Sequence, residues 1–494
     1  MSKYILAIDQ GTTSSRAIIF DVSGKPISQH QIDLQQFYPE PGWVEQDAVE
    51  MYDNTITCCI EALKNANLAA KEICAIGITN QRETTILWNK TTGKPIHNAI
   101  VWQDRRTASL CRELKQLPIS KTISAKTGLL LDPYFSATKI IWLLENVKDA
   151  KTKALNGDLL FGTIDTYFLW RLTNGASHAT DATNASRTML YNIVKQQWDD
   201  EILSSFDIPK NILPKVMDNS AEFGETDESI FGTKIPITGM AGDQQAATFG
   251  QACFTPGMVK CTYGTGCFML MNTGSRLINS EHNLLSTIAY RLNGKTVYGL
   301  EGSIFSAGVT IKWLRDSLGL IKSAKETADL AKSVDDTDGV YLVPGFTGLG
   351  APYWDPDARG ALLFLTSNSS KAHIARAALE SVCYQSHDLL DAMRHDSETP
   401  IEVLRVDGGM VANDWLLQFL SDNLMIEVQR PQCIETTARG VAFLAGLQVG
   451  VYKSLDDIQN LWQSNASFTP KMSAAKSKHL YNGWKKAVKR VLTK

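Results

Sequence analysis

Each half of this chain contains the same short plan, in which two strands flank a turn rich in glycine and threonine. The first copy is YILAIDQGTTSSRAIIFD at 4–21, and the second is GMVKCTYGTGCFMLMNTG at 257–274. Two such hairpins predict duplicated domains that face one another. The stretch GQACFTPG at 250–257 interrupts the helical pattern and indicates the boundary, so we expect domains at 1–252 and 253–494.

Between and after the hairpins, short apolar segments alternate with longer helical patterns. Examples are KEICAIGITN, GDLLFGTIDTYFLWRL, and KIPITG followed by DQQAATFG. This alternation is typical of an α/β fold. Two amphipathic helices are also expected, with buried faces formed by Val49, Tyr52, Ile56, Cys59, Ile60 and Leu63 and by Leu480, Trp484, Ala487, Val488 and Val491. The second is interpreted as a docking helix, with a membrane-surface or partner helix as the alternative.

Composition limits the class of protein further. With 494 residues, 44% hydrophobic and 20% charged, the chain can bury two or more cores. A net charge of -3 argues against a polyelectrolyte that binds nucleic acid or a membrane surface, so a small-molecule partner is expected. The nine cysteines include no C-x-x-C pair and are interpreted as reduced, mostly buried thiols. Because neither a secretory leader nor a membrane-spanning apolar run is evident, a cytoplasmic protein is expected.

The first turn has the properties of an anion-binding site. Its sequence Gly-Thr-Thr-Ser-Ser lacks the lysine ending of a P-loop and the spaced glycines of a dinucleotide fold. Gly11 permits a close backbone approach, while Thr12, Thr13 and Ser14 add hydroxyl donors to the neighbouring N–H groups. The turn is therefore expected to hold phosphate.

Two charged residues flank this turn. Arg16 adds positive charge, and Asp9, at the end of the first strand, could hold a hydrated Mg²⁺ ion, which accepts few carboxylates and keeps its waters. The alternative is an ordinary polar hairpin with Asp9 in an Asx-turn.

Two later segments add to this pattern. The turn Tyr263-Gly264-Thr265-Gly266 offers a second surface rich in backbone donors to a phosphate chain. The segment VDGGMVAN at 406–413 ends a strand with paired glycines and opens a helix, which lets a flat base lie against the backbone. Asn413 is then placed to hydrogen-bond an adenine edge.

The order of these three elements resembles the two phosphate motifs and the adenosine motif of the actin, heat-shock chaperone and hexokinase superfamily. The segments SATKIIWLLEN and GFTGLGAPYWDPDARG resemble the FGGY carbohydrate kinases within it. The strings DQGTTSSR, TNQRETT, VWQDRR, GMAGDQQAA, YGTGCF and DGGMVAND resemble the members of that family that phosphorylate glycerol. The resemblance extends nearly from end to end.

This resemblance implies two actin-like (ribonuclease H-like) ATPase domains, with mixed sheets flanked by helices and the active site in the cleft between them. It implies ATP and Mg²⁺ as cofactors, glycerol as the substrate and a homodimer or homotetramer. The implied substrate-binding residues are Arg82, Glu83, Trp102, Tyr134, Asp243, Gln244 and Phe268. The implied nucleotide-binding residues are Thr12, Thr13, Ser14, Arg16, Thr265, Gly308, Gly409, Asn413 and Lys312, the last at a place where relatives carry Gln.

Asp243 and the Arg82-Glu83 pair are the residues that carry the expected chemistry. Phosphorylation of an alcohol needs a group that accepts the hydroxyl proton, and Asp243, at the start of a helix pattern, is the candidate. From its position alone it could instead be an N-cap. Treated as an exposed side chain, it would be a weak base. Arg82 and Glu83 can bind vicinal hydroxyls as donor and acceptor, although adjacent opposite charges also suit a solvated turn.

Two other functions share some of these features. A kinase for a pentulose or another polyol would use the same nucleotide site, but Glu83 with Tyr134 argues against it. An ATP-dependent clamp or filament protein would lack a use for Arg82, Glu83 and Asp243.

Some relatives bind a sugar bisphosphate at an Arg-containing, Gly-rich loop or carry a phosphorylated histidine nearby. Residues 220–237 contain neither arginine nor histidine, so weak or absent control by either route is expected.

Overall fold

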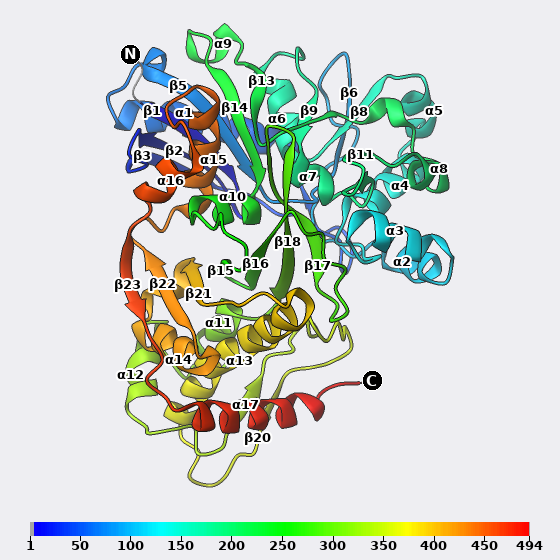
Figure 1. Cartoon of the computed structure of the whole chain (residues 1–494). Coiled ribbons are helices and arrows are strands. Elements are labelled where there is room, and N and C mark those ends of the chain that lie inside the picture. The colour runs from blue at the N-terminus through cyan, green and yellow to red at the C-terminus, as the bar shows by residue number, and fades with distance from the viewer. Residues whose placement is uncertain (1–3, 494) are drawn as a thin grey trace.

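Two mixed sheets, one in each half of the chain, form the frame of the protein (Figure 1). The computed structural model describes residues 4–493. The first sheet has the strand order β13-β14-β5-β1-β2-β3. Its strands are β1 (Tyr4–Gln10), β2 (Ser14–Asp21), β3 (Pro26–Asp33), β5 (Ile73–Asn80), β13 (Ser220–Glu225) and β14 (Pro236–Gly242).

The second sheet has the order β17-β18-β16-β15-β21-β22-β23. Its strands are β15 (Val259–Tyr263), β16 (Cys267–Gly274), β17 (Leu285–Leu292), β18 (Lys295–Ile304), β21 (Val403–Asp407), β22 (Glu427–Pro431) and β23 (Ser464–Phe468). In both sheets an antiparallel hairpin, β1-β2 or β15-β16, is followed by two parallel neighbours, β5-β14 or β21-β22. The shared order and strand direction confirm the expected α/β fold of two mixed sheets flanked by helices.

Helices cover both faces of the first sheet, which explains why its central strand is apolar at successive positions. Leu6 and Ile8 of β1 pack in one core with helix α1 (Ala48–Asn65), whereas Ile5 and Ala7 pack in another with helix α15 (Thr436–Gln448). Because side chains alternate between the two faces of a strand, β1 contributes residues to both cores.

The remaining elements form the outer layers and the connections. The other helices are α2 (Ala108–Lys115), α3 (Ile119–Thr127), α4 (Ser136–Asn146), α5 (Ala150–Leu155), α6 (Ile164–Leu172), α7 (Ala182–Ser186), α8 (Asp200–Ser205), α9 (Glu228–Phe231), α10 (Asp243–Gly250), α11 (Gly308–Asp316), α12 (Glu326–Lys332), α13 (Lys371–Ser397), α14 (Asp414–Leu424), α16 (Leu455–Leu461), α17 (Ala474–Lys489), and the 3₁₀ turns η1 (Ala70–Glu72), η2 (Lys210–Ile212) and η3 (Gly409–Ala412). The short strands are β4 (Glu45–Gln46), β6 (Ile86–Asn89), β7 (Ala99–Ile100), β8 (Leu159–Gly162), β9 (Ala179–Asp181), β10 (Tyr191–Asn192), β11 (Gln197–Trp198), β12 (Lys215–Met217), β19 (Tyr341–Val343) and β20 (Ala361–Leu363).

Helix α15 follows the second sheet's β22 in the chain but packs against the first sheet and against α10 (Figure 1). The two helices approach closely because each has a glycine at the contact. A Cβ atom on Gly440 would lie 1.8 Å from the carbonyl oxygen of Ala246, and one on Gly250 would lie 2.0 Å from that of Thr436. These pairings make the helices antiparallel and fix the junction of the two halves.

The prediction of which residues of α1 are buried is partly wrong. Val49 and Ile60 are 36% and 45% exposed, while Met51 and Cys58 are fully buried. The helix packs against β2 and β3, and this contact rotates the buried stripe toward Met51 and Cys58.

The expected docking of the C-terminal helix is confirmed. Trp484 and Tyr481 of α17 are buried, and both donate hydrogen bonds to the carboxylate of Asp388 in α13, at 2.8 and 2.7 Å. Seven of the nine cysteines are also buried, as expected.

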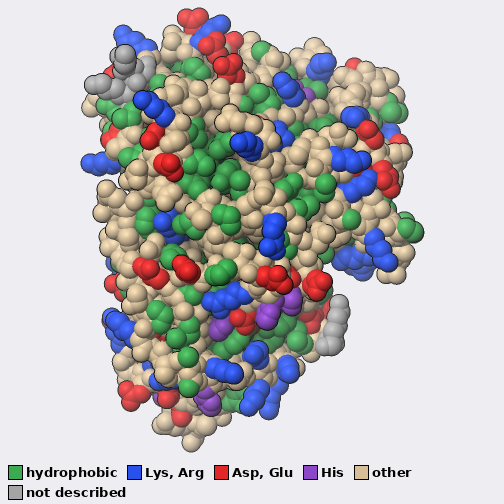
Figure 2. All heavy atoms as spheres, viewed as in Figure 1, with side chains coloured by type: hydrophobic (Ala, Val, Ile, Leu, Met, Phe, Trp, Pro, Cys, Tyr) green, Lys and Arg blue, Asp and Glu red, His purple; other side chains and the backbone are tan. Residues whose placement is uncertain are grey.

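The surface fits the near-neutral net charge. Figure 2 shows acidic and basic side chains interspersed over one face of the molecule. Among residues 4–493, no helix is both long and apolar enough to cross a membrane.

The glycine contact between α10 and α15 gives a first prediction. Gly440→Ala should destabilise the protein by roughly 1–3 kcal/mol or more, because the added methyl group must displace the backbone of Ala246. Thermal unfolding followed by circular dichroism measures the effect. Gln448→Ala, an exposed change on the same helix, is the control and should alter stability by less than about 0.5 kcal/mol. Equal melting temperatures for the two variants would contradict the close contact.

Candidate active site

Four charged side chains are buried together between the two sheets. Arg82 and Glu83 follow β5, Arg187 follows α7, and Glu301 belongs to β18 of the second sheet. The carboxylate of Glu301 accepts from Arg82 Nη1 at 2.5 Å and Nη2 at 3.1 Å, and from Arg187 Nη2 at 2.8 Å. Arg187 Nε donates to Glu83 Oε1 at 2.7 Å. Because Arg82 and Glu83 are buried, the solvated-turn alternative is wrong.

Local sequence explains how this cluster fits. Gly242 leaves space for the stem of Arg82, since a Cβ at that position would lie 2.7 Å from Arg82 Cγ and Cδ. Glu83 has a φ of 62°, a left-handed conformation that is costly for a residue with a side chain. Its carbonyl oxygen accepts the hydroxyl hydrogen of Ser136, the first residue of α4, at 3.1 Å. The structure therefore holds Glu83 from several sides.

Burial shifts the pKa values of the acids in the cluster in different directions. For Glu301, burial favours the neutral acid, but Arg187 and Arg82 outweigh it and hold the pKa at about 2. For Glu83, burial prevails over Arg82 and Arg187 and raises the pKa. Glu301 is thus a fixed anion, whereas Glu83 is easier to protonate than an ordinary glutamate.

Asp243 is the first residue of α10 and lies beside this cluster. Its Oδ1 atom lies 3.2 Å from Arg82 Nε and accepts the backbone N–H of Gln244 at 2.7 Å. Gly242 occupies the N-cap position, so the N-cap alternative is wrong. The side chain is only 31% exposed, and burial raises its pKa against the opposing effects of Arg82 and Lys260. Asp243 is therefore not a fully exposed side chain, and its pKa lies above the ordinary value of an aspartate.

Gln244 faces a buried cation from the second sheet. Its Oε1 atom accepts from Lys260 Nζ at 2.6 Å, and Lys260 is fully buried on β15. Burial lowers the pKa of Lys260, although nearby Asp407 opposes this shift.

Three aromatic residues expected to bind the substrate lie together. The Trp102 ring is 5.5 Å from Tyr134 and 6.1 Å from Phe268, both in edge-to-face geometry. Phe268 comes from β16, so this aromatic group joins the two halves. Trp102 Nε1 donates to Thr12 Oγ1 at 2.9 Å, which links the group to the first turn.

The charges around the first turn are paired. Asp9 Oδ2 binds Arg16 Nη2 at 2.5 Å, and Arg16 Nη1 binds Glu435 at 2.6 Å. Burial would lower the pKa of Arg16, but the two acids raise it. The Asp9 carboxylate thus bonds Arg16, in place of the Asx-turn considered above. Thr13 and Ser14 continue the turn, and Gly11 N–H donates to Ser14 O at 3.0 Å.

The second turn is joined to the start of α11. Thr265 O accepts N–H groups from Ala307 at 3.0 Å and Val309 at 3.1 Å, while Gly308 N–H donates to Gly264 O at 3.0 Å. A Cβ on Gly308 would lie 2.6 Å from that oxygen. Lys312, one turn further along α11, is exposed.

A cavity of about 620 Å³ receives side chains from both halves. Arg16 comes from the first half, and the rest of the lining comes from the second. The lining residues are Arg16, Thr262, Asp407, Gly408, Gly409, Val411, Ala412, Arg430, Ile434, Glu435, Thr436 and Thr437. Asn413, which is not among them, caps α14 by accepting the N–H of Leu416 at 3.2 Å.

Sequence reasoning missed Arg187, Glu301, Lys260 and Glu435. Glu301 lies in the apolar strand VYGLEGSI, and Lys260 in the strand VKCTY, so a charge within a buried strand was the available signal. Arg187 and Glu435 lie in unremarkable local sequence.

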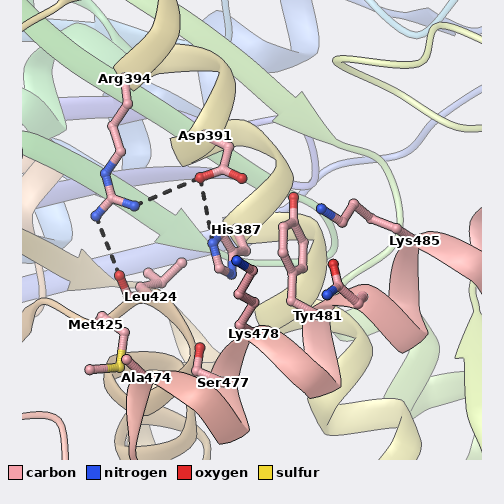
Figure 3. A pocket seen from close by; sticks show the side chains of 11 residues that line it. His387, Asp391, Arg394, Leu424, Met425, Ala474, Ser477, Lys478, Tyr481 and Lys485 are labelled. Carbon is pink, nitrogen blue, oxygen red and sulfur yellow. Dashed lines mark hydrogen bonds and ion pairs between the residues drawn. The ribbon is translucent and has the colours of Figure 1, made fainter.

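A second cavity, of about 310 Å³, lies between α13 and α17 (Figure 3). Several of its charged groups bind one another. Arg394 pairs with Asp391 at 3.7 Å and donates to Leu424 O at 3.3 Å, while the His387 ring stacks on Tyr481 at 3.7 Å. This cavity is lined only from the second half of the chain, whereas the larger cavity joins both halves.

Comparison with known proteins agrees with the two-domain fold. Residues 4–250 match the FGGY family of carbohydrate kinases, N-terminal domain, and residues 259–449 match its C-terminal domain. The chain belongs to this family.

Individual relatives narrow the assignment. Glycerol kinases of Coxiella burnetii (strain RSA 331 / Henzerling II) and Marinomonas sp. (strain MWYL1) are each 58% identical over 494 residues, covering 100% of this chain and 98% and 100% of theirs. The crystal structure of Plasmodium falciparum glycerol kinase with ADP aligns with a TM-score of 0.94 at 39% identity, covering 99% of this chain and 98% of that one. Within the FGGY family, the chain therefore groups with the glycerol kinases.

The two glycines that line the larger cavity give the second prediction. Gly408 has a φ of 92° and its Cβ would lie 2.5 Å from Tyr263 O, whereas a Cβ on Gly409 would meet no atom within 4 Å. Gly409→Ala should keep the melting temperature but weaken binding of an ATP analogue by about tenfold, or 1.4 kcal/mol, measured by calorimetry. Gly408→Ala should lower the melting temperature. Full nucleotide affinity in Gly409→Ala would contradict the expected role of Gly409 in nucleotide binding.

Proposed function

We propose that the protein transfers the terminal phosphoryl group of ATP to glycerol and forms sn-glycerol 3-phosphate, the first step of glycerol catabolism. The observation that carries the proposal is the position of Asp243, a partly exposed acid beside the buried Arg82, Glu83 and Glu301 cluster. The nearby aromatic group supplies an apolar wall of limited extent. The glycerol kinase relatives support this substrate.

Hydrogen-bonding capacity explains how a small polyol is recognised. Arg82 uses its Nε and both Nη atoms on Asp243, Gln245 and Glu301, which leaves one Nη2 hydrogen among its described contacts. Glu83 uses Oε1 on Arg187, so Oε2 can accept hydroxyl hydrogens. One donor and one acceptor side by side suit two adjacent hydroxyl groups, while Trp102, Tyr134 and Phe268 cover the carbon atoms.

Asp243 is proposed as the general base. Oδ1 is engaged by Arg82 and by the N–H of Gln244, so Oδ2 is the atom that accepts the hydroxyl proton. The raised pKa, caused first by burial, brings this carboxylate closer to the range in which a base is effective near neutral pH. Gln244, held by Lys260, is proposed to orient the substrate.

The nucleotide is proposed to lie along the larger cavity. The turns at Thr12–Ser14 and Thr265 are proposed to offer backbone and hydroxyl donors to its phosphates. Gly308, at the start of α11, and Lys312, one turn further along, are proposed to lie near the phosphates, and Gly409 and Asn413 near the base. Within residues 4–493, no cluster of three or more His, Cys, Asp or Glu side chains could enclose a metal. Asp9, with only Oδ2 committed to Arg16, suits an ion such as Mg²⁺ that keeps its waters. Such an ion would offset phosphate charge.

The function is tested by product analysis. The protein, ATP, Mg²⁺ and glycerol should give glycerol 3-phosphate and ADP, detected by mass spectrometry. Pentuloses and larger polyols, tested in parallel, should give much slower turnover because the aromatic wall limits the space. ATP turnover that is indifferent to glycerol would refute the proposal.

Replacement of the proposed base gives the next prediction. Asp243→Asn should retain ATP binding but lower kcat by about a hundredfold or more, because the amide cannot accept the proton. Steady-state kinetics and calorimetry separate the two effects. Asp388→Asn, a buried change between α13 and α17, is the control for a general loss of stability. Unchanged kcat in Asp243→Asn would exclude the role.

A further inference from the structure

We propose that Arg187 is a positioning residue that presents Glu83 to the polyol substrate, and that Glu301 of the second half holds Arg187 and Arg82 in place for this task. The inference rests on the proposed function. Arg187 is proposed to act without contacting the reacting atoms. Because Glu301 comes from the second half of the chain, substrate recognition would depend on both halves.

The contacts of Arg187 show its orientation. It is fully buried, donates from Nε to Glu83 Oε1 at 2.7 Å and from Nη2 to Glu301 Oε1 at 2.8 Å. Its guanidinium lies 5.7 Å from the centre of the Tyr134 ring and 5.3 Å from that of Phe135. Nη1 is buried and has no hydrogen-bond partner among the described residues. A buried arginine with an unsatisfied donor lowers the free energy of unfolding, so a contribution to stability alone does not explain its presence.

The bond to Arg187 selects one orientation of the Glu83 carboxylate. Because Oε1 is committed, Oε2 is the atom left for the substrate, and the side chain does not need to be ordered when the polyol binds. Glu301 binds both arginines through one carboxylate, so the donor on Arg82 and the acceptor on Glu83 keep a fixed relation. Removal of Arg187 would release Glu83 without touching Asp243.

Helix α7 ties Arg187 to the base. Asp181 caps this helix by accepting the N–H groups of Thr183 at 2.6 Å and Asn184 at 3.4 Å. Thr183 Oγ1 in turn accepts the N–H of Gly242, the residue before Asp243, at 3.0 Å. The same short helix therefore places the residue that orients Glu83 and the backbone that carries the base.

Arg187 also affects the charge of Glu83. Burial raises the pKa of Glu83, while Arg82 and Arg187 oppose the rise. The charged and titratable groups that act on Glu83 are Arg82, Arg187, Glu301, Tyr134 and Lys139. Without Arg187 the pKa should rise further, so the ionised form that accepts hydroxyl hydrogens would be reached only at higher pH.

The experiment compares the full-length protein with Arg187→Gln and Arg187→Lys. In Arg187→Gln, kcat/KM for glycerol should fall about tenfold or more near neutral pH, mainly through KM, as expected for a lost hydrogen bond to a buried carboxylate. The acidic limb of its pH profile should move to higher pH. KM for ATP at saturating glycerol should stay within about twofold. Arg187→Lys keeps the charge and should restore part of the shift.

Two further variants distinguish a specific effect on glycerol binding from a general loss of folding. Glu301→Gln weakens the hold on Arg187 from the other side and should raise KM for glycerol with a smaller shift of the profile. Arg376→Gln removes a partly buried arginine paired with Glu380 at 2.8 Å within α13, and should leave both KM values and the profile unchanged. Thermal unfolding with and without glycerol shows which variants are folded and bind the polyol.

The outcomes are distinguishable. A uniform decrease in activity with an unshifted pH profile, or equal increases in KM for glycerol and ATP, would show that Arg187 is only structural and would overturn the inference. Failure of the unmodified protein to phosphorylate glycerol would instead overturn the proposed function. If Arg187→Gln does not fold, Arg187→Lys and Glu301→Gln test the inference instead. The acidic limb of their pH profiles must then move to higher pH.

Discussion

The contact between α10 and α15 is the constraint on which the arrangement of the two halves depends. Gly440 and Gly250 let two antiparallel helices meet at their backbones, and a side chain at either position would force them apart. Asp243 stands at the start of α10, while Glu435 and Thr436, which line the larger cavity, stand at the start of α15. An eight-residue helix is about 12 Å long, so this one contact sets how far the proposed base lies from the proposed nucleotide.

The buried ion pairs have a different role from the helix contact. Burying charges costs several kcal/mol for each ion, and pairing repays this only when geometry is favourable. A set of arginines and acids at the centre of the protein is therefore weak evidence for stability. It is better explained by specificity, because Glu301 orients both Arg82 and Arg187 and each of them faces Glu83. The low pKa of Glu301 and the raised pKa of Glu83 follow from the same geometry.

The sequence predicted those parts of the molecule that are encoded locally. Both hairpins, the strand before Asp243 and the docking of Trp484 follow from residue patterns a few positions long. The rotation of α1 could not be predicted, since Val49 and Ile60 fit the same periodicity as its buried positions. The partnership of Arg82, Arg187 and Glu301 joins positions more than a hundred residues apart, and no local rule indicates it. The sequence thus predicted the site residues but not the ion pairs that orient them.

The same reasoning changes the expected role of Arg16. The sequence suggested a cation available to phosphate, but Asp9 and Glu435 compensate its charge from two different halves of the chain. Phosphate that approached Arg16 would therefore face two carboxylates as well as the guanidinium. In the proposed function, the charge of the phosphate is met instead by the backbone N–H groups of the two turns and by a hydrated cation at the remaining oxygen of Asp9. On this view Arg16 mainly orients Asp9, and its bond to Glu435 makes the geometry of the first turn depend on α15 and so on the contact between the two helices.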